Sequence, residues 1–350
     1  MTYSVKALAV SSPTSNFTEI EIDRRALNAN DVLIDIEYAG ICHSDIHQAR
    51  NEWFEGIFPM VPGHEIAGVI REVGTDVTKF KVGDRVGVGV MVDSCGECEY
   101  CLVGRENVCL AGNVPTYNGR DKDGSPTYGG YSQSIVVKEN YVLNIPASLN
   151  LDVAAPLLCA GVTVYLPLRN WGVMAGKKVA IYGLGGLGHL AVKIAVAMGA
   201  EVFVLGRSLA KKPDAVNFGA TDYFNVSDAE VWGNLKNKFD LILNTTSANL
   251  DLDEVLSWLR IDGALVNVGL PGKPESFDPF TIIGGFKAIA GSNTGGIPET
   301  QEMLDFCASH GIGADIELIA PESAVVDAAY DRVVNSDVKY RFVIEMNKLS

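Results

Sequence analysis

A glycine-rich stretch between Gly183 and Gly188 constrains the fold of this chain more than any other feature. It reads Gly-Leu-Gly-Gly-Leu-Gly, follows the apolar run 179–182 and precedes a segment rich in alanine, valine and isoleucine over about 187–198. A strand, a glycine turn and a helix in this order let the backbone approach a pyrophosphate, whose charge the free amides of the helix N-terminus bind. We therefore expect a dinucleotide-binding unit; a glycine turn without a ligand is the alternative. The residues expected at the cofactor are Gly183, Gly185, Gly186, Leu187 and Gly188.

The end of the next expected strand, 202–205, indicates which dinucleotide would bind. NAD-binding versions carry an acidic residue there that accepts a hydrogen bond from the ribose 2′-hydroxyl. Here Gly206 and Arg207 follow the strand, and no carboxylate comes before Asp214. A 2′-phosphate beside Arg207 and Lys211 would gain charge-assisted hydrogen bonds of about 1.5–3 kcal/mol each. The sequence therefore predicts NADP(H), with a solvated basic helix start as the alternative.

Four cysteines crowd into one short segment: Cys95, Cys98, Cys101 and Cys109. Spacers of two residues let a loop wrap four thiolates around one zinc ion at about 2.3 Å. Such a site has no open coordination position, so we expect this zinc to be structural. Disulfide pairing within the segment is the alternative.

Three further candidate ligands lie far apart in the sequence, namely Cys42, His64 and Cys159. Two thiolates and one imidazole would leave zinc a fourth position for a substrate, as in catalytic alcohol-oxidising sites. No member of this trio is specific alone, because a cysteine in an apolar run such as 157–161 is more often a buried core thiol.

Composition limits the other possibilities. At 350 residues the chain exceeds what one hydrophobic core usually serves, so we expect two domains. With 28 basic and 43 acidic residues the net charge is −15, which argues against nucleic-acid and anionic-membrane partners. Short β-like runs fill residues 1–150, whereas strands and helices alternate from Lys177 onward, as in a parallel sheet. No stretch resembles a signal peptide or a membrane helix, so we expect a cytoplasmic protein.

These motifs together resemble the zinc-dependent medium-chain alcohol dehydrogenases, most closely the cinnamyl-alcohol-dehydrogenase-like branch. Besides the glycine loop and the four cysteines, the resemblance rests on five motifs: 42–45 (Cys-His-Ser-Asp), 63–68 (Gly-His-Glu-x-x-Gly), 129–132 (Gly-Gly-Tyr-Ser), 157–163 and 339–343. It implies an α/β protein with a GroES-like β-barrel catalytic domain, 1–153 plus 294–350. A Rossmann domain with a doubly wound parallel sheet would occupy 154–293.

The resemblance also assigns roles around the metal. Cys42, His64 and Cys159 would bind the catalytic zinc, and Glu65 would be a carboxylate able to approach it. Asp45 would orient His64. Ser44 would bond the substrate oxygen, and His47 would end a proton relay. The spacing of Cys42 with Asp45, and of Ser44 with His47, would suit a short helix.

The remaining implied roles concern the cofactor and the substrate. Thr163 resembles a nicotinamide contact, His43 and Arg341 resemble pyrophosphate contacts, and Ser208 joins the 2′-phosphate corner. Trp53 and Asn293 lie where the substrate pocket is expected. The implied reaction interconverts primary alcohols and aldehydes, aromatic or aliphatic, with NADP(H) and two zinc ions per chain, in a homodimer that favours aldehyde reduction.

Three alternatives remain. An NAD-dependent polyol or secondary-alcohol dehydrogenase would favour an acid at position 206. A zinc-free quinone or enoyl reductase would lack Cys42, His64 and Cys159 as a set. A non-catalytic zinc module would leave the relay residues without a purpose.

Overall fold

The computed structural model describes residues 2–349, which form two compact units. The first unit runs to Val162 and resumes at Thr294, and the second is Thr163–Asn293. The helix α4 (Ala160–Asn170) continues from one unit into the other. A unit built mainly on antiparallel strands and a unit with a parallel sheet, as expected from the sequence, are both present.

A mostly antiparallel sheet organises the first unit, in the strand order β16-β17-β3-β4-β5-β9 with β8 paired to β3. The strands are β3 (Asp31–Gly40), β4 (Ile66–Val73), β5 (Arg85–Val88), β8 (Ser134–Lys138), β9 (Leu143–Asn144), β16 (Ile316–Ile319) and β17 (Arg341–Ile344). Two smaller pairs join β1 (Tyr3–Ala9) with β2 (Thr18–Arg24), and β6 (Met91–Asp93) with β7 (Val114–Pro115). β5 ends at Val88 and β6 begins at Met91; between them, a Cβ on Gly89 would lie 3.0 Å from the Leu158 carbonyl oxygen.

Short helices lie between these strands. They are α1 (His43–Ala49), α2 (Glu99–Leu102), α3 (Leu151–Ala154), α9 (Ile297–His310) and α10 (Ser323–Val334). The short helix expected around residues 42–47 is confirmed as α1, with Cys42 at its N-cap. The core of the unit draws on β1, β3, β4 and α10, so the last helix packs with the first strands.

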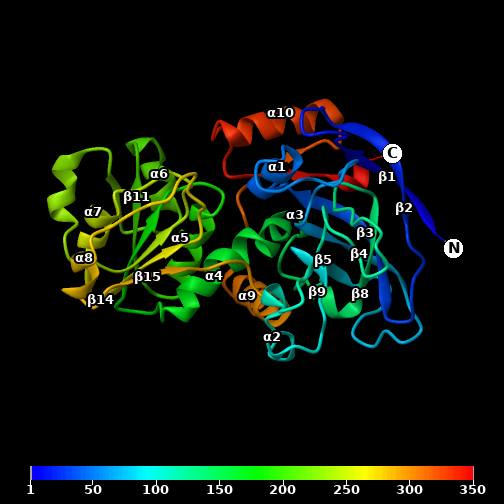
Figure 1. The fold of residues 1–350 in the computed structure, drawn as a ribbon, viewed down its shortest axis with the longest axis horizontal. Helices are drawn as coiled ribbons and strands as arrows, with labels where there is room; N and C mark the ends of the chain where they lie inside the picture. Colours follow the sequence, from blue (N-terminus) through cyan, green and yellow to red (C-terminus); the bar gives the residue numbers. More distant parts are fainter. Residues whose placement is uncertain (1, 350) are drawn as a thin grey trace. The chain divides into compact units, whose positions relative to one another are not determined.

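The second unit contains a six-stranded parallel sheet in the order β12-β11-β10-β13-β14-β15 (Figure 1, green to yellow). Its strands are β10 (Lys178–Tyr182), β11 (Glu201–Gly206), β12 (Asp222–Asn225), β13 (Phe239–Asn244), β14 (Leu259–Asn267) and β15 (Ala288–Gly291). Its helices α5 (Gly188–Ala197), α6 (Lys212–Asn217) and α7 (Leu252–Ser257) pack against the sheet, and α8 (Phe280–Ile283) contacts α7. This strand order is that of dinucleotide-binding Rossmann folds, whose ligands lie at the carboxyl edge where the order reverses.

No single helix in residues 2–349 has both the length and the apolar character to cross a bilayer. The bent pair Leu151–Leu158 and Ala160–Asn170 passes that test only when its two parts are joined across a 59° bend.

Candidate metal centres and nucleotide site

The three dispersed ligands converge in the first unit. Cys42 follows β3, His64 precedes β4, and Cys159 precedes α4. One ligand atom of each, together with a carboxylate oxygen of Glu65, lies within 4.8 Å of all the others. The sulfurs of Cys42 and Cys159 are 4.0 Å apart, close to the roughly 3.8 Å that tetrahedral zinc with 2.3 Å bonds imposes. The donor set and its spacing therefore fit a zinc ion.

The electrostatics of this cluster favour a metal-binding thiolate. A hydrogen bond shared with Cys159 lowers the pKa of the Cys42 thiol well below its usual range. Burial raises the pKa of Glu65 to about 8, although the guanidinium of Arg341 opposes that rise through an ion pair. The second oxygen of Glu65 is buried and has no hydrogen-bond partner. One carboxylate oxygen of Glu65 belongs to the ligand cluster, so a cation bound there would lie beside this carboxylate.

The carboxylate of Asp45 connects the segments that carry Cys42 and His64. This carboxylate is fully buried and accepts hydrogen bonds from the Cys42 amide (2.8 Å), the Gly63 amide (3.2 Å) and His64 Nδ1 (3.0 Å). The bond to Nδ1 leaves Nε2 of His64 as the nitrogen available to a metal. Asp45 therefore fixes both the ring orientation of His64 and the start of α1.

Three tyrosines surround this carboxylate, and none of them was assigned a role from the sequence. The Tyr131 hydroxyl donates to Asp45 at 3.3 Å and accepts from the Tyr330 hydroxyl at 3.4 Å. The Tyr117 ring stacks on His64 with centroids 5.7 Å apart. Burial raises the pKa of all three phenols well above the usual value, so they remain neutral donors. Only Tyr131 had a signal, because it lies in the Gly-Gly-Tyr-Ser motif.

The predicted proton-transfer residues lie along α1. The Ser44 hydroxyl is 3.6 Å from the Cys42 sulfur, next to the metal cluster. His47 is one turn further along, where its Nδ1 bonds the Glu52 carboxylate and its ring stacks on Trp53 with centroids 4.6 Å apart. Glu52 was not expected from the sequence. Trp53, expected near the substrate, therefore lies against His47.

The four-cysteine segment forms the second cluster. One sulfur from each of Cys95, Cys98, Cys101 and Cys109 lies within 4.8 Å of the others. The Cys95 and Cys101 sulfurs are 3.8 Å apart, which suits two ligands of one zinc ion and excludes a disulfide bond. A backbone hydrogen bond from Cys101 lowers the pKa of Cys98 to about 6, so its thiolate forms readily.

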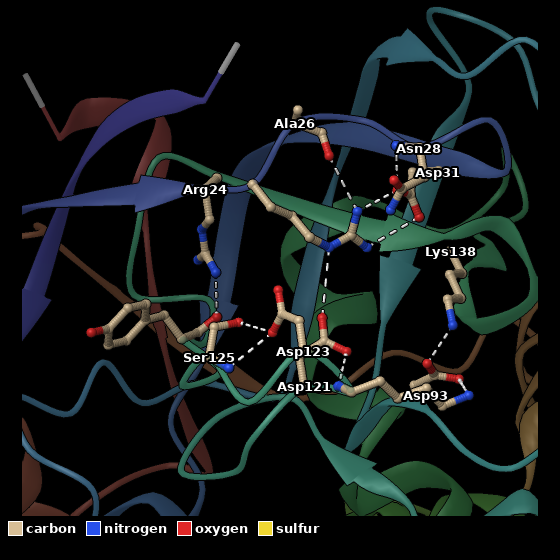
Figure 2. Close-up of polar contacts among 12 residues, drawn as sticks. Arg24, Ala26, Asn28, Asp31, Asp93, Asp121, Asp123, Ser125 and Lys138 are labelled. Atoms are coloured by element: carbon tan, nitrogen blue, oxygen red, sulfur yellow. Dashed lines mark hydrogen bonds and ion pairs between the residues drawn. The ribbon is translucent and has the colours of Figure 1, made fainter.

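Ion pairs and hydrogen bonds at Asp93 and Ser94 hold the backbone just before the four-cysteine segment. Figure 2 shows Lys138 directed at Asp93, with which it forms an ion pair. Lys122 bonds both the Asp93 carboxylate (3.3 Å) and the Ser94 carbonyl (2.8 Å). The Ser94 hydroxyl in turn lies 3.1 Å from the Cys101 sulfur. These contacts fix the backbone just before Cys95 and orient the Cys101 sulfur.

The glycine loop lies at the carboxyl edge of the parallel sheet. Gly183 follows β10 with φ of 94°, and its amide donates to the Leu205 carbonyl of β11 at 2.8 Å. A Cβ on Gly188, the first residue of α5, would lie 2.1 Å from the Gly183 carbonyl oxygen. A Cβ on Gly185 would meet no atom within 4 Å, so the space in front of it is open. The backbone around Gly183 and Gly188 is therefore closely packed, whereas the space beside Gly185 is open and fits a pyrophosphate.

The predicted 2′-phosphate corner follows β11. Arg207 and Ser208 are exposed there, and the Lys211 ammonium donates to the Leu184 carbonyl of the glycine loop at 2.9 Å. Lys211 therefore ties the corner to the loop. Both features lie at the same edge of the second unit.

The remaining predicted residues are spread over both units. His43 is exposed at the start of α1, whereas Arg341 is buried on β17 beside Glu65. Thr163 and Asn293 are the first and last residues of the second unit. Their assigned roles stay predictions.

Two family models match most of the chain, and related proteins match nearly all of it. The model of the alcohol dehydrogenase GroES-like domain matches residues 28–147, and that of the zinc-binding dehydrogenase domain matches 186–309. A probable formaldehyde dehydrogenase, AdhA, of Bacillus subtilis is 59% identical, with 99% of each chain covered. The aldehyde reductase YahK of Escherichia coli is 48% identical, also with 99% of each covered. The crystal structure of a CAD from Helicobacter pylori complexed with NADP(H) is 45% identical, covers 99% of both chains and gives a TM-score of 0.92.

Two separate zinc clusters predict a simple stoichiometry. Cys42→Ser should lower the zinc content from two ions to one per chain, because it removes one thiolate from the dispersed cluster only. The matched control is Cys307→Ser, a buried cysteine outside both clusters, which should keep both ions. Elemental analysis of the purified variants measures this, and two zinc ions in Cys42→Ser would contradict the assignment.

Proposed function

The chain belongs to the zinc-dependent medium-chain alcohol dehydrogenases, and from this membership we propose that it interconverts primary alcohols and aldehydes with NADP(H), favouring aldehyde reduction. The observation that carries the proposal is the convergence of Cys42, His64 and Cys159, backed by the buried Asp45 carboxylate. The names of the E. coli relative and of the H. pylori structure support the substrate class and the cofactor.

When bound, zinc supplies a Lewis acid that polarises the carbonyl, and the nicotinamide supplies the hydride that the carbonyl carbon accepts. The reduction then also needs one proton on the substrate oxygen. The Ser44 hydroxyl lies 3.6 Å from the Cys42 sulfur of the metal cluster and would donate that proton. His47 would replace it, since Glu52 and Trp53 hold the imidazole in one orientation at a partly exposed position.

The NAD-dependent polyol alternative finds no support at the corner after β11. Position 206 is a glycine, and Arg207 and Ser208 are the exposed side chains that follow it. Basic and hydroxyl side chains suit a 2′-phosphate, whereas NAD would need a carboxylate for its ribose hydroxyl.

The substrate assignment extends to aromatic aldehydes such as cinnamyl or benzyl types, and to aliphatic ones. The Trp53 ring is 37% exposed beside His47, so part of it is free to contact an apolar substrate. Asn293 remains a second proposed contact. The cytoplasmic location also stays a prediction.

We further propose that the protein is a homodimer that pairs through β15. This strand is an edge of the six-stranded sheet, and an unpaired edge is a template for a second strand. Large exposed apolar side chains precede it in the chain, on α8 and the turn that follows, and one more lies on the neighbouring strand β14: Phe280, Ile283, Phe286 and Ile261. The Asp262 amide bonds the Gly285 carbonyl at 2.9 Å, so these two segments form one surface.

Removing the relay imidazole tests the proton path. His47→Gln should lower the rate of aldehyde reduction about 10²-fold and flatten its pH dependence, because imidazole exchanges protons near neutral pH and glutamine does not. Both zinc ions should remain bound. Steady-state rates between pH 5.5 and 9 are compared with those of His310→Gln, an exposed histidine at the end of α9. An unchanged pH profile would remove His47 from the mechanism.

The basic corner predicts a cofactor preference. Arg207→Ala should raise the Kd for NADPH about tenfold and leave that for NADH within twofold, because only NADPH carries the phosphate that Arg207 would bind. Titration of nicotinamide fluorescence measures both constants. Arg260→Ala, an exposed arginine elsewhere on the second unit, is the matched control and should change neither. Equal losses for the two cofactors would contradict the assignment.

Introducing a charge beside β15 tests the dimer. Phe280→Asp should convert the protein to a monomer in sedimentation-velocity experiments, because a carboxylate would be buried without a partner in the interface. The control Val216→Asp changes an exposed apolar residue on α6 and should leave the dimer intact. A monomeric wild-type protein, or a dimeric Phe280→Asp, would refute this interface.

A further inference from the structure

The buried side chain of Tyr223, on β12, lies against Gly206, the last residue of the second Rossmann strand β11. β11 and β12 are parallel, with Val204 opposite Tyr223 and Gly206 opposite Asn225. Side chains on strands lean along the strand direction, so the Tyr223 ring can reach a residue two positions further along its neighbour. The Gly206 carbonyl accepts the Val226 amide at 2.9 Å, which fixes the backbone at this point.

Tyr223 occupies the space that a side chain on Gly206 would need. A Cβ at position 206 would lie 1.9 Å from the Tyr223 hydroxyl oxygen, 2.6 Å from Cζ and 3.3 Å from Cε1. Favourable contacts between heavy atoms begin at about 3.5 Å. Gly206 is not among the glycines with positive φ, so steric exclusion rather than backbone conformation requires glycine here.

The ring has little freedom to withdraw. Tyr223 is 5% exposed, and its backbone belongs to the parallel ladder with β11. Because a tyrosine has only two side-chain torsions, moving the hydroxyl away from position 206 displaces the whole ring from a packed interior. Overpacking of this kind destabilises the folded protein.

Position 206 is where an NAD-binding Rossmann unit carries its acid. It is the last residue of the second strand, at the edge that also holds the glycine loop. We propose that Tyr223 is a cofactor-specificity residue, which excludes a carboxylate from position 206 and thereby removes the acceptor that NAD would need. The inference rests on the proposed NADP(H) dependence and assigns a cause to it.

The Tyr223 hydroxyl also suits NADP(H). Burial raises the pKa of Tyr223, so the phenol keeps its proton and offers a donor, not a negative charge, at this corner. Arg207 follows directly, and its carbonyl accepts the Ser227 hydroxyl at 3.2 Å, which links the two strand ends. A neutral donor beside a basic side chain favours a phosphate over a free hydroxyl.

The test is a set of variants at these two positions, with Kd values for NADPH and NADH measured by fluorescence titration. Gly206→Asp alone should weaken both cofactors at least tenfold, because the ring and the carboxylate compete for one space. Gly206→Asp with Tyr223→Val should bind NADH at least tenfold more tightly than Gly206→Asp alone and reject NADPH. The control Gly206→Asp with Tyr223→Phe should behave as the single variant, since Cζ alone lies 2.6 Å from the Cβ position.

A second measurement does not depend on cofactor binding. Gly206→Ala should lower the Tm by about 3 °C or more in the wild-type background and by clearly less in Tyr223→Val. Equal Tm losses in both backgrounds, or a Gly206→Asp variant that binds NADH well with Tyr223 in place, would overturn the role of Tyr223. A wild-type protein that binds NADH as tightly as NADPH would instead overturn the proposed cofactor, whatever the variants show.

Discussion

The buried carboxylate of Asp45 is the interaction on which the dispersed metal site depends. It accepts hydrogen bonds from the amides of Cys42 and Gly63 and from the ring of His64, so it joins two segments that each end in a ligand. A buried charge without partners would cost several kcal/mol, whereas here every bond also orients the site. The Tyr131 and Tyr330 hydroxyls extend this network to α10, which ties the C-terminal segment to the ligands.

The two zinc clusters solve the same coordination problem differently. The structural cluster is local, because α2 and its flanking turns bring four thiolates together within one loop anchored by Asp93. The dispersed cluster draws its ligands from the segments next to β3, β4 and α4, so it exists only when the first unit is folded. The dispersed cluster also places the Glu65 carboxylate beside its three other ligands. The four-cysteine cluster contains thiolates alone.

Local patterns explain what the sequence could predict. The strand expected over 202–205, the helix after the glycine loop and both metal clusters follow from spacing, apolar runs and residue type. What it could not predict depends on contacts between distant segments. Glu52 beside His47, and Tyr330 behind Tyr131, involve ordinary residues whose roles arise only from their placement. The helix α10 was also missed, because it carries no motif.

The nucleotide corner shows the same limit most clearly. The absence of an acid at position 206 is visible in the sequence, but its cause is not, since Tyr223 follows 17 residues later and meets Gly206 only through the parallel register of β11 and β12. The metal site is specified by groups that attract, namely charges and hydrogen-bond donors around Asp45. In the cofactor site, part of the specificity comes from Tyr223, which excludes a side chain from position 206. A glycine at such a position therefore indicates that a neighbouring side chain, here that of Tyr223, fills the space that a larger residue would need.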